Sequence, residues 1–68
     1  MVEIFRKRLK AEIKESGITV KELAERVGVS PEMITQYYTT KKLPRLDTFE
    51  RICRALDVSA DYLLGIVD

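Results

Sequence analysis

The sequence predicts an all-α fold of five helices, in a single domain that spans residues 1–68. Apolar residues recur at the i, i+3, i+4 spacing that is typical of amphipathic helices. Serine and threonine N-caps and glycine stops divide this pattern into short segments. A chain of this length buries only about 60% of its unfolded surface, and helices with local contacts suit so modest a core.

The first helix is expected from about Val2 to Ser16. Phe5, Leu9 and Ile13 lie at i, i+4 and i+8, so they form one apolar stripe along it. Gly17 follows at the point where a glycine can end the helix in the left-handed conformation.

The second helix begins with a capping-box pattern. The Thr19 hydroxyl can accept a hydrogen bond from the Glu22 amide, while the Glu22 carboxylate reaches back to Thr19. The inward face of this helix consists of Leu23, Ala24 and Val27. Gly28 ends the helix.

The third helix has an equally clear start. Ser30 is a good N-cap, and Pro31 suits the first helical position because its missing N–H is harmless there. Ile34 and Tyr37 are expected to point inward. A polar loop follows and closes at Pro44.

The fourth helix is expected from about Leu46 to Leu56. Its apolar residues follow the i, i+3, i+4, i+7 rhythm and are Leu46, Phe49, Ile52, Cys53 and Leu56. A short fifth helix is capped by Ser59 and ends at Gly65. Its apolar contacts come from Tyr62, Leu63 and Leu64.

Residues 20–39 have the pattern of a helix-turn-helix. Two helices that cross closely need a small side chain, which Ala24 supplies, and a sharp turn favours the positive φ that Gly28 allows. Ile34 then holds the second of these helices against the core. Such a unit presents its second helix to the major groove of DNA, so the sequence predicts DNA binding.

Residues that match the pattern of a known protein family are found over most of the chain. They are Leu9, Gly17-Ile18-Thr19, Glu22-Leu23-Ala24, Gly28-Val29-Ser30, Ile34, Lys41-Lys42, Pro44, Leu46-Asp47-Thr48, Ala55-Leu56-Asp57-Val58-Ser59 and Asp61-Tyr62-Leu63-Leu64. On these residues the chain resembles the lambda repressor/Cro-like helix-turn-helix family, which includes Xre-type bacterial regulators. The resemblance implies a compact five-helix DNA-binding domain that regulates transcription, commonly as a homodimer on a palindromic operator.

Several positions depart from the family's pattern. Val20 stands where the family usually has a glutamine that contacts phosphate or a base, and the valine side chain cannot form a hydrogen bond. Thr40 stands where the family often has glycine, so either Thr40 adopts an unusual backbone angle or the loop differs. Ile13 and Tyr38 stand where many members have an Arg–Glu pair, and we expect these two side chains to touch.

The outward face of the third helix supplies the candidate base contacts. Gln36 matches a base-contact position of the family and can bond an adenine at N6 and N7, the alternative being a solvated side chain. Glu32 can accept from cytosine N4 or can serve only the helix dipole. Thr35 can contact base or phosphate, or be simply exposed. Pro31 can pack on a thymine methyl or act only in the cap.

Ammonium and hydroxyl groups around this face are candidates for contact with DNA phosphates, which carry no sequence information. They are Lys41, Lys42, Thr39, Lys21 and Thr19, with plain solvation as the alternative. The cations of the first helix are expected to form a solvated face, with a DNA role as the alternative. They are Arg6, Lys7, Arg8 and Lys10.

The net charge is only +1, but it is unevenly distributed. Residues 1–16 carry five cations against three carboxylates, and residues 30–45 carry three against one. Residues 46–68 carry two cations against five carboxylates. An anionic partner such as double-stranded DNA would therefore meet the first two thirds of the chain.

Three apolar residues have no evident place in the predicted core. They are Leu43 in the polar loop and Ile66 and Val67 after Gly65. We expect them to form a homodimer surface. A two-fold dimer would place two recognition helices about 34 Å apart and so double the base contacts of one half-site.

Composition argues against other classes of function. With no histidine and one cysteine, a structural zinc site and an internal disulfide are out of reach, and no cofactor or small-molecule ligand is implied. No nucleophile and base are arranged for catalysis, so we expect no enzyme activity. The chain has no membrane-spanning run or signal peptide, and a reducing cytoplasm fits its cysteine usage.

Two functions remain from the sequence. The first is a sequence-specific transcriptional regulator, most simply a small repressor. The second is a protein-interaction module that keeps the fold without binding DNA. Val20, Pro31, Glu32 and the low net charge favour this second hypothesis.

Overall fold

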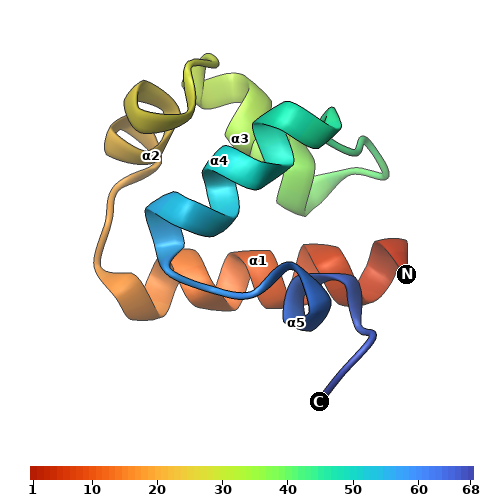
Figure 1. Ribbon diagram of the computed structural model, residues 1–68. Helices are drawn as coiled ribbons and strands as arrows, with labels where there is room; N and C mark the ends of the chain where they lie inside the picture. The colour runs from red at the N-terminus through yellow and green to blue at the C-terminus, as the bar shows by residue number, and fades with distance from the viewer.

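A computed structural model describes all residues from Met1 to Asp68 and contains five α-helices and no strand. The helices are α1 (Val2–Ser16), α2 (Val20–Val27), α3 (Pro31–Thr39), α4 (Leu46–Leu56) and α5 (Ala60–Leu64). The long α1 runs along one side of the molecule, α4 crosses over it, and α5 lies against α1 (Figure 1). α2 packs against both α3 and α4, and α3 also packs against α1. The all-α, five-helix prediction is confirmed.

The core forms where these helices face one another. Its buried apolar members are Phe5, Leu9, Ile13, Leu23, Ala24, Val27, Ile34, Tyr37, Phe49, Ile52, Leu56 and Leu63. The rings of Phe5 and Phe49 meet edge to face, with their centroids 5.8 Å apart, and so join α1 to α4. The stripes that the sequence predicted for the first, second and third helices are all in this core.

Side-chain caps fix where three of the helices begin. Thr19 Oγ1 accepts from the Glu22 amide at 3.0 Å, and the Glu22 carboxylate accepts from the Thr19 amide at 3.3 Å. Ser30 Oγ accepts from the Met33 amide at 3.2 Å, and Ser59 caps α5 in the same way. The predicted capping box and the two serine caps are thus confirmed, and they set the register of the helices that follow.

Leu46 corrects the predicted stripe of α4. It is 85% exposed, whereas the other large apolar residues of the stripe are buried or half-buried. Leu46 is the first residue of α4, and Thr48 takes the buried place in that first turn. The apolar spacing therefore predicted the helix correctly but placed one residue too many in the core.

Thr40 resolves the alternative that the sequence left open for the loop after α3. Its φ of −128° and ψ of −179° are ordinary extended values, so the loop differs from a glycine-containing one. The Thr40 hydroxyl donates to the Gln36 carbonyl at 2.7 Å and accepts from the Lys42 amide at 3.1 Å. This side chain therefore supports the loop that carries the two lysines.

None of the five helices combines the length and the apolar character needed to cross a membrane.

Candidate nucleic-acid interface

The α2–turn–α3 unit is built around one small residue and one glycine. Ala24 is fully buried where α2 packs on α3, so its methyl group lets the two backbones approach closely. Gly28 adopts a φ of 85° and donates to the Ala24 carbonyl at 2.8 Å, and the Val29 amide bonds the same carbonyl at 3.1 Å. This left-handed turn redirects the chain into α3, as the sequence predicted.

The outward face of α3 is polar and open to solvent. Pro31, Glu32, Thr35 and Gln36 are all exposed, whereas Ile34 and Tyr37 of the same helix are buried. The structure therefore brings the four residues predicted to contact bases onto one face. The Gln36 amide group and the Glu32 carboxylate form no hydrogen bond or ion pair within the chain, which leaves both groups free for a ligand.

The exposed hydroxyls near this face are already engaged. Thr39 Oγ1 donates to the Thr35 carbonyl at 2.7 Å, so its proton is directed back into the helix. Thr19 Oγ1 donates to Glu22 Oε1 at 3.0 Å while it accepts from the Glu22 amide. Neither hydroxyl offers a proton to a phosphate unless its present bond is broken. Sequence reasoning placed both threonines but did not include these local bonds.

The three lysines predicted to contact phosphate are exposed. Lys42 lies in the loop after α3, and its Nζ is 3.5 Å from the Met33 sulfur, so it borders the Met33 side of α3. Lys41 precedes it in the same loop, and Lys21 lies in the first turn of α2. These ammonium groups form no ion pair within the chain, so their full charge faces solvent.

Sequence reasoning missed a contact of α1 with the end of α3. The Arg6 Nη2 donates to the Thr39 carbonyl at 3.3 Å, and Arg6 is half-buried, although a solvated face was expected. The cation therefore lies at the C-terminal end of α3, where the helix dipole favours positive charge. Arg6 is next to the apolar stripe of α1 on a helical projection, which is the one signal in the sequence for its partial burial.

Burial and capping shift three pKa values. Hydrogen bonds from the Thr19 side chain and backbone lower the pKa of the Glu22 carboxyl below its ordinary value. Burial raises the pKa of the Tyr37 hydroxyl and that of the Cys53 thiol. Cys53 is half-buried on α4.

The structure contains no group of three or more histidine, cysteine, aspartate or glutamate side chains that could hold a metal ion.

The apolar residues expected at a dimer surface are exposed. Leu43 is 41% exposed, Ile66 68% and Val67 48%. Leu43 also lines an apolar groove of about 140 Å³ beside the N-terminus of α1. The other residues that line this groove are Met1, Phe5, Pro44, Leu46, Phe49 and Leu64.

The molecule consists of five helices, and a sharp turn joins α2 to α3. α3 buries its apolar face and exposes its polar face. This arrangement defines a lambda-repressor-like DNA-binding fold. The chain belongs to the helix-turn-helix family, whose model matches residues 9–63. This family membership confirms the resemblance that the sequence motifs indicated.

Two curated relatives come from Bacillus subtilis (strain 168). The uncharacterized HTH-type transcriptional regulator YobD is 34% identical over 65 residues, which cover 96% of this chain and 58% of YobD. The HTH-type transcriptional regulator ImmR is 36% identical over 59 residues, which cover 87% of this chain and 46% of ImmR. The chain thus spans about half the length of both relatives. No solved structure is significantly similar.

Proposed function

We propose that this chain binds double-stranded DNA through α3 and regulates transcription in the cytoplasm. The observation that carries the proposal is the division of α3 into a buried apolar face and an exposed polar face that no other element covers. A helix held in this way has the form needed to enter the major groove. The relatives named as transcriptional regulators support the same function.

The side chains of this face have different roles in the proposal. Gln36 reads an adenine through its amide group, and Glu32 accepts from a cytosine amine. Thr35 and Pro31 make the smaller contacts, with phosphate or base and with a thymine methyl. Lys42 and its neighbour Lys41 bind phosphates and so hold the helix in place without reading sequence. Lys21 contributes a further phosphate contact. Thr19 and Thr39 contribute theirs once each hydroxyl exchanges its bond within the chain for one to a DNA phosphate.

We further propose that the protein is a repressor that binds a palindromic operator as a homodimer. The exposed Leu43, Ile66 and Val67 support a two-fold contact between copies. One α3 reads few base pairs, whereas two copies about 34 Å apart read two half-sites. Sedimentation equilibrium of the chain with and without Leu43→Gln would test this contact. A monomer at all concentrations, with or without operator DNA, would contradict the dimer.

The DNA proposal is tested by selecting binding sites from random duplex DNA and then titrating the selected site with salt. We expect a symmetric site with defined half-site spacing, and a log K that falls linearly with log salt as counterions are released. Gln36→Ala should relax the preference at one base pair, at a cost of about 1–3 kcal/mol on the selected site.

Lys42→Ala is the matched phosphate variant. It should weaken selected and unrelated DNA alike and reduce the salt slope by about 1. Absence of DNA binding even at low salt would contradict the proposed function. Binding whose affinity does not change with salt would contradict it as well.

A protein-interaction module is the second candidate function. It is favoured by Pro31, which has no N–H, and by the exposed Glu32 carboxylate, which repels phosphates from the centre of the α3 face. Val20 at the start of α2 also provides no polar group. A stable complex with a partner protein through this face, combined with no DNA shift at low salt, would establish the second function in place of the first.

A further inference from the structure

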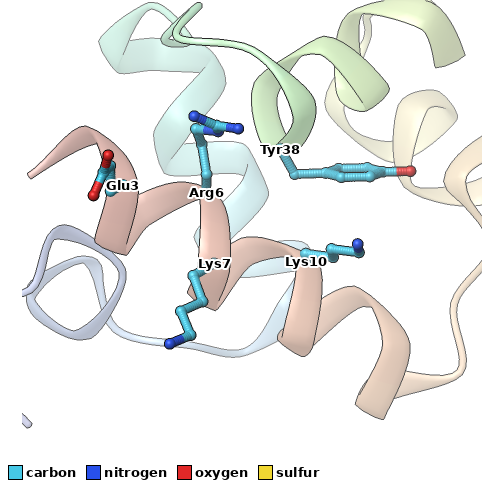
Figure 2. Close-up of a pocket in the computed structure, with 5 residues that line it drawn as sticks. All are labelled: Glu3, Arg6, Lys7, Lys10 and Tyr38. Atoms are coloured by element: carbon cyan, nitrogen blue, oxygen red, sulfur yellow. The ribbon is translucent and has the colours of Figure 1, made fainter.

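A second group of cations borders α3, on the side of α1. Arg6, Lys7 and Lys10 of α1 surround a hollow of about 290 Å³ together with Tyr38 of α3. We call these four residues the α1 cluster. Figure 2 shows Arg6 and Lys10 extending from α1 on the side of Tyr38, whereas the Lys7 side chain points away from Tyr38. Glu3 is the one carboxylate that lines the hollow.

The cations of the α1 cluster form no ion pair within the chain. The two ion pairs of the structure are Arg45–Asp47 and Arg54–Glu50, and neither involves α1. The Arg6 Nε is buried and has no hydrogen-bond partner. Since Nη2 of the same guanidinium is held by the Thr39 carbonyl at 3.3 Å, the group is fixed at the end of α3, and its buried Nε is not itself open to a ligand.

The position of the α1 cluster relative to α3 is what indicates a ligand. Successive residues of a helix are about 100° apart, so Met33 and Tyr38 lie on opposite edges of the exposed face of α3. Both are half-buried, as residues at such edges should be. Lys42 contacts Met33 on one edge, and the cations of the α1 cluster line the hollow beside Tyr38 on the other. The outward face of α3 is thus bordered on both sides by cations that form no ion pair.

We propose that the α1 cluster binds a backbone phosphate of the DNA strand opposite to the strand that Lys42 contacts. The major groove is about 12 Å wide and is bordered by a phosphate backbone on each side. A helix that lies in it meets negative charge along both edges, and cations on both edges hold it centred. Arg6 and Lys10 supply the charge, and the Tyr38 hydroxyl can donate to the same phosphate. This inference rests on the proposed function.

Lys10→Gln is the first test, because Lys10 is exposed and its loss leaves the fold intact. On the selected DNA site, the slope of log K against log salt should fall by about 0.9 for each phosphate contact that is lost. Base preference should not change, because phosphate contacts do not read sequence. Arg54→Gln is the control, since it removes one charge from an exposed position on α4 that is outside the α1 cluster.

Glu3→Gln provides a test in which the affinity for DNA should change in the opposite direction. Removal of the single carboxylate in the hollow should strengthen binding of every duplex. Glu15→Gln removes the same charge from an exposed position of the same helix outside the hollow, so it measures the long-range effect alone. We expect a greater gain for Glu3→Gln than for Glu15→Gln at low salt. Equal gains from the two variants would argue against a local phosphate.

The outcomes separate this inference from the function on which it rests. If the wild-type chain binds no DNA, the proposed function fails. If it binds with a steep salt slope that Lys42→Ala lowers, but Lys10→Gln behaves like Arg54→Gln, the inference alone is overturned. A free anion is tested by adding inorganic phosphate at constant ionic strength. Amide shifts in residues 6–10 together with an unchanged slope for Lys10→Gln would assign the hollow to a free anion and overturn the DNA contact.

Discussion

The guanidinium of Arg8 lies over the ring of Tyr62, 4.3 Å from the ring centroid. Its Nη1 also donates to the carbonyl oxygens of Tyr62, at 2.6 Å, and Val67, at 2.8 Å. One side chain of α1 thus fastens both α5 and the residues after it. Arg8 belongs to the helix face that was expected to be solvated, so this fastening is a structural role that the sequence did not indicate.

Loss of the Arg8 fastening should loosen the C-terminal end of the chain. We expect Arg8→Gln to lower the free energy of unfolding by about 1–2 kcal/mol, because a cation–π contact and charged hydrogen bonds are lost. Hydrogen exchange should accelerate at the amides of Gly65 and Ile66, which bond carbonyls of α5. Lys14→Gln, an exposed change on the same helix, is the control, and equal exchange rates in the two variants would contradict this role.

A larger side chain at position 24 should separate α2 from α3. Ala24 is fully buried at the helix crossing, so Ala24→Leu is expected to cost about 1–3 kcal/mol through overpacking. Denaturant unfolding measures the change. Ala11→Leu adds the same atoms at an exposed position of α1 and should alter stability by less than about 0.5 kcal/mol. A well-tolerated Ala24→Leu would show that the crossing does not require a small residue.

The cap of α3 allows stability and DNA binding to be separated. Ser30→Ala removes the acceptor for the Met33 amide and should cost about 1 kcal/mol of stability. Ser30→Asp restores an acceptor and should recover most of that loss, but it places a carboxylate at the start of α3, which the proposed function puts close to the DNA phosphates. We therefore expect Ser30→Asp to be stable in thermal unfolding and weak in DNA binding. Equal DNA affinity for the wild type and Ser30→Asp would place the start of α3 away from the phosphates.

The capping box of α2 should give a small pH dependence to stability. The pKa of Glu22 is lower in the folded state than its ordinary value of 4.5, because Thr19 donates to the carboxylate. The stabilisation is therefore fully present above about pH 4.5 and is lost as the pH falls through the lower, folded-state pKa. Glu22→Gln should show a flatter fall of stability across this acidic range in urea unfolding. Parallel curves for the two proteins would exclude the effect.

Leu46 should be replaceable without loss of stability. Because its side chain is 85% exposed, we expect Leu46→Gln to change the free energy of unfolding by less than about 0.5 kcal/mol. Phe49→Ala, one turn later in the same helix, should cost about 3–5 kcal/mol because Phe49 is buried against Phe5. A large loss in Leu46→Gln at micromolar concentration, but not on dilution, would indicate that Leu46 is covered by a second copy.

The parts of the fold that the sequence predicted depend on neighbours in the chain. Thr19 and Ser30 accept hydrogen bonds from amides three residues further along the chain, so a stretch of four residues is enough to recognise each helix cap. The contact of Arg8 with Tyr62 joins residues 54 positions apart and depends on how α5 packs against α1. Leu46 fits the apolar rhythm of α4, yet its exposure depends on what lies opposite the first turn. Neither the Arg8–Tyr62 contact nor the exposure of Leu46 can be predicted from the spacing of residues in the sequence.

The candidate site divides in the same way. The open face that holds Gln36 follows from the inward residues of α3, which the sequence identified. The occupied hydroxyl of Thr39 and the hydrogen bond from Arg6 follow from geometry at the end of α3, where two helices meet. The contact expected between Ile13 and Tyr38 stays a prediction. Tyr38 is half-buried and lines the hollow of the α1 cluster.

The two faces of α3 share no residue. Ile34 and Tyr37 hold the helix in the core, while Thr35 and Gln36 contribute nothing to that packing. Surface substitutions remote from packing usually change stability by less than about 0.5 kcal/mol. On the proposed function, a lineage that carries this domain can therefore acquire a new operator through a few changes on the outward face, without an unstable intermediate. The same independence makes α3 a natural position at which to install a chosen DNA preference by design.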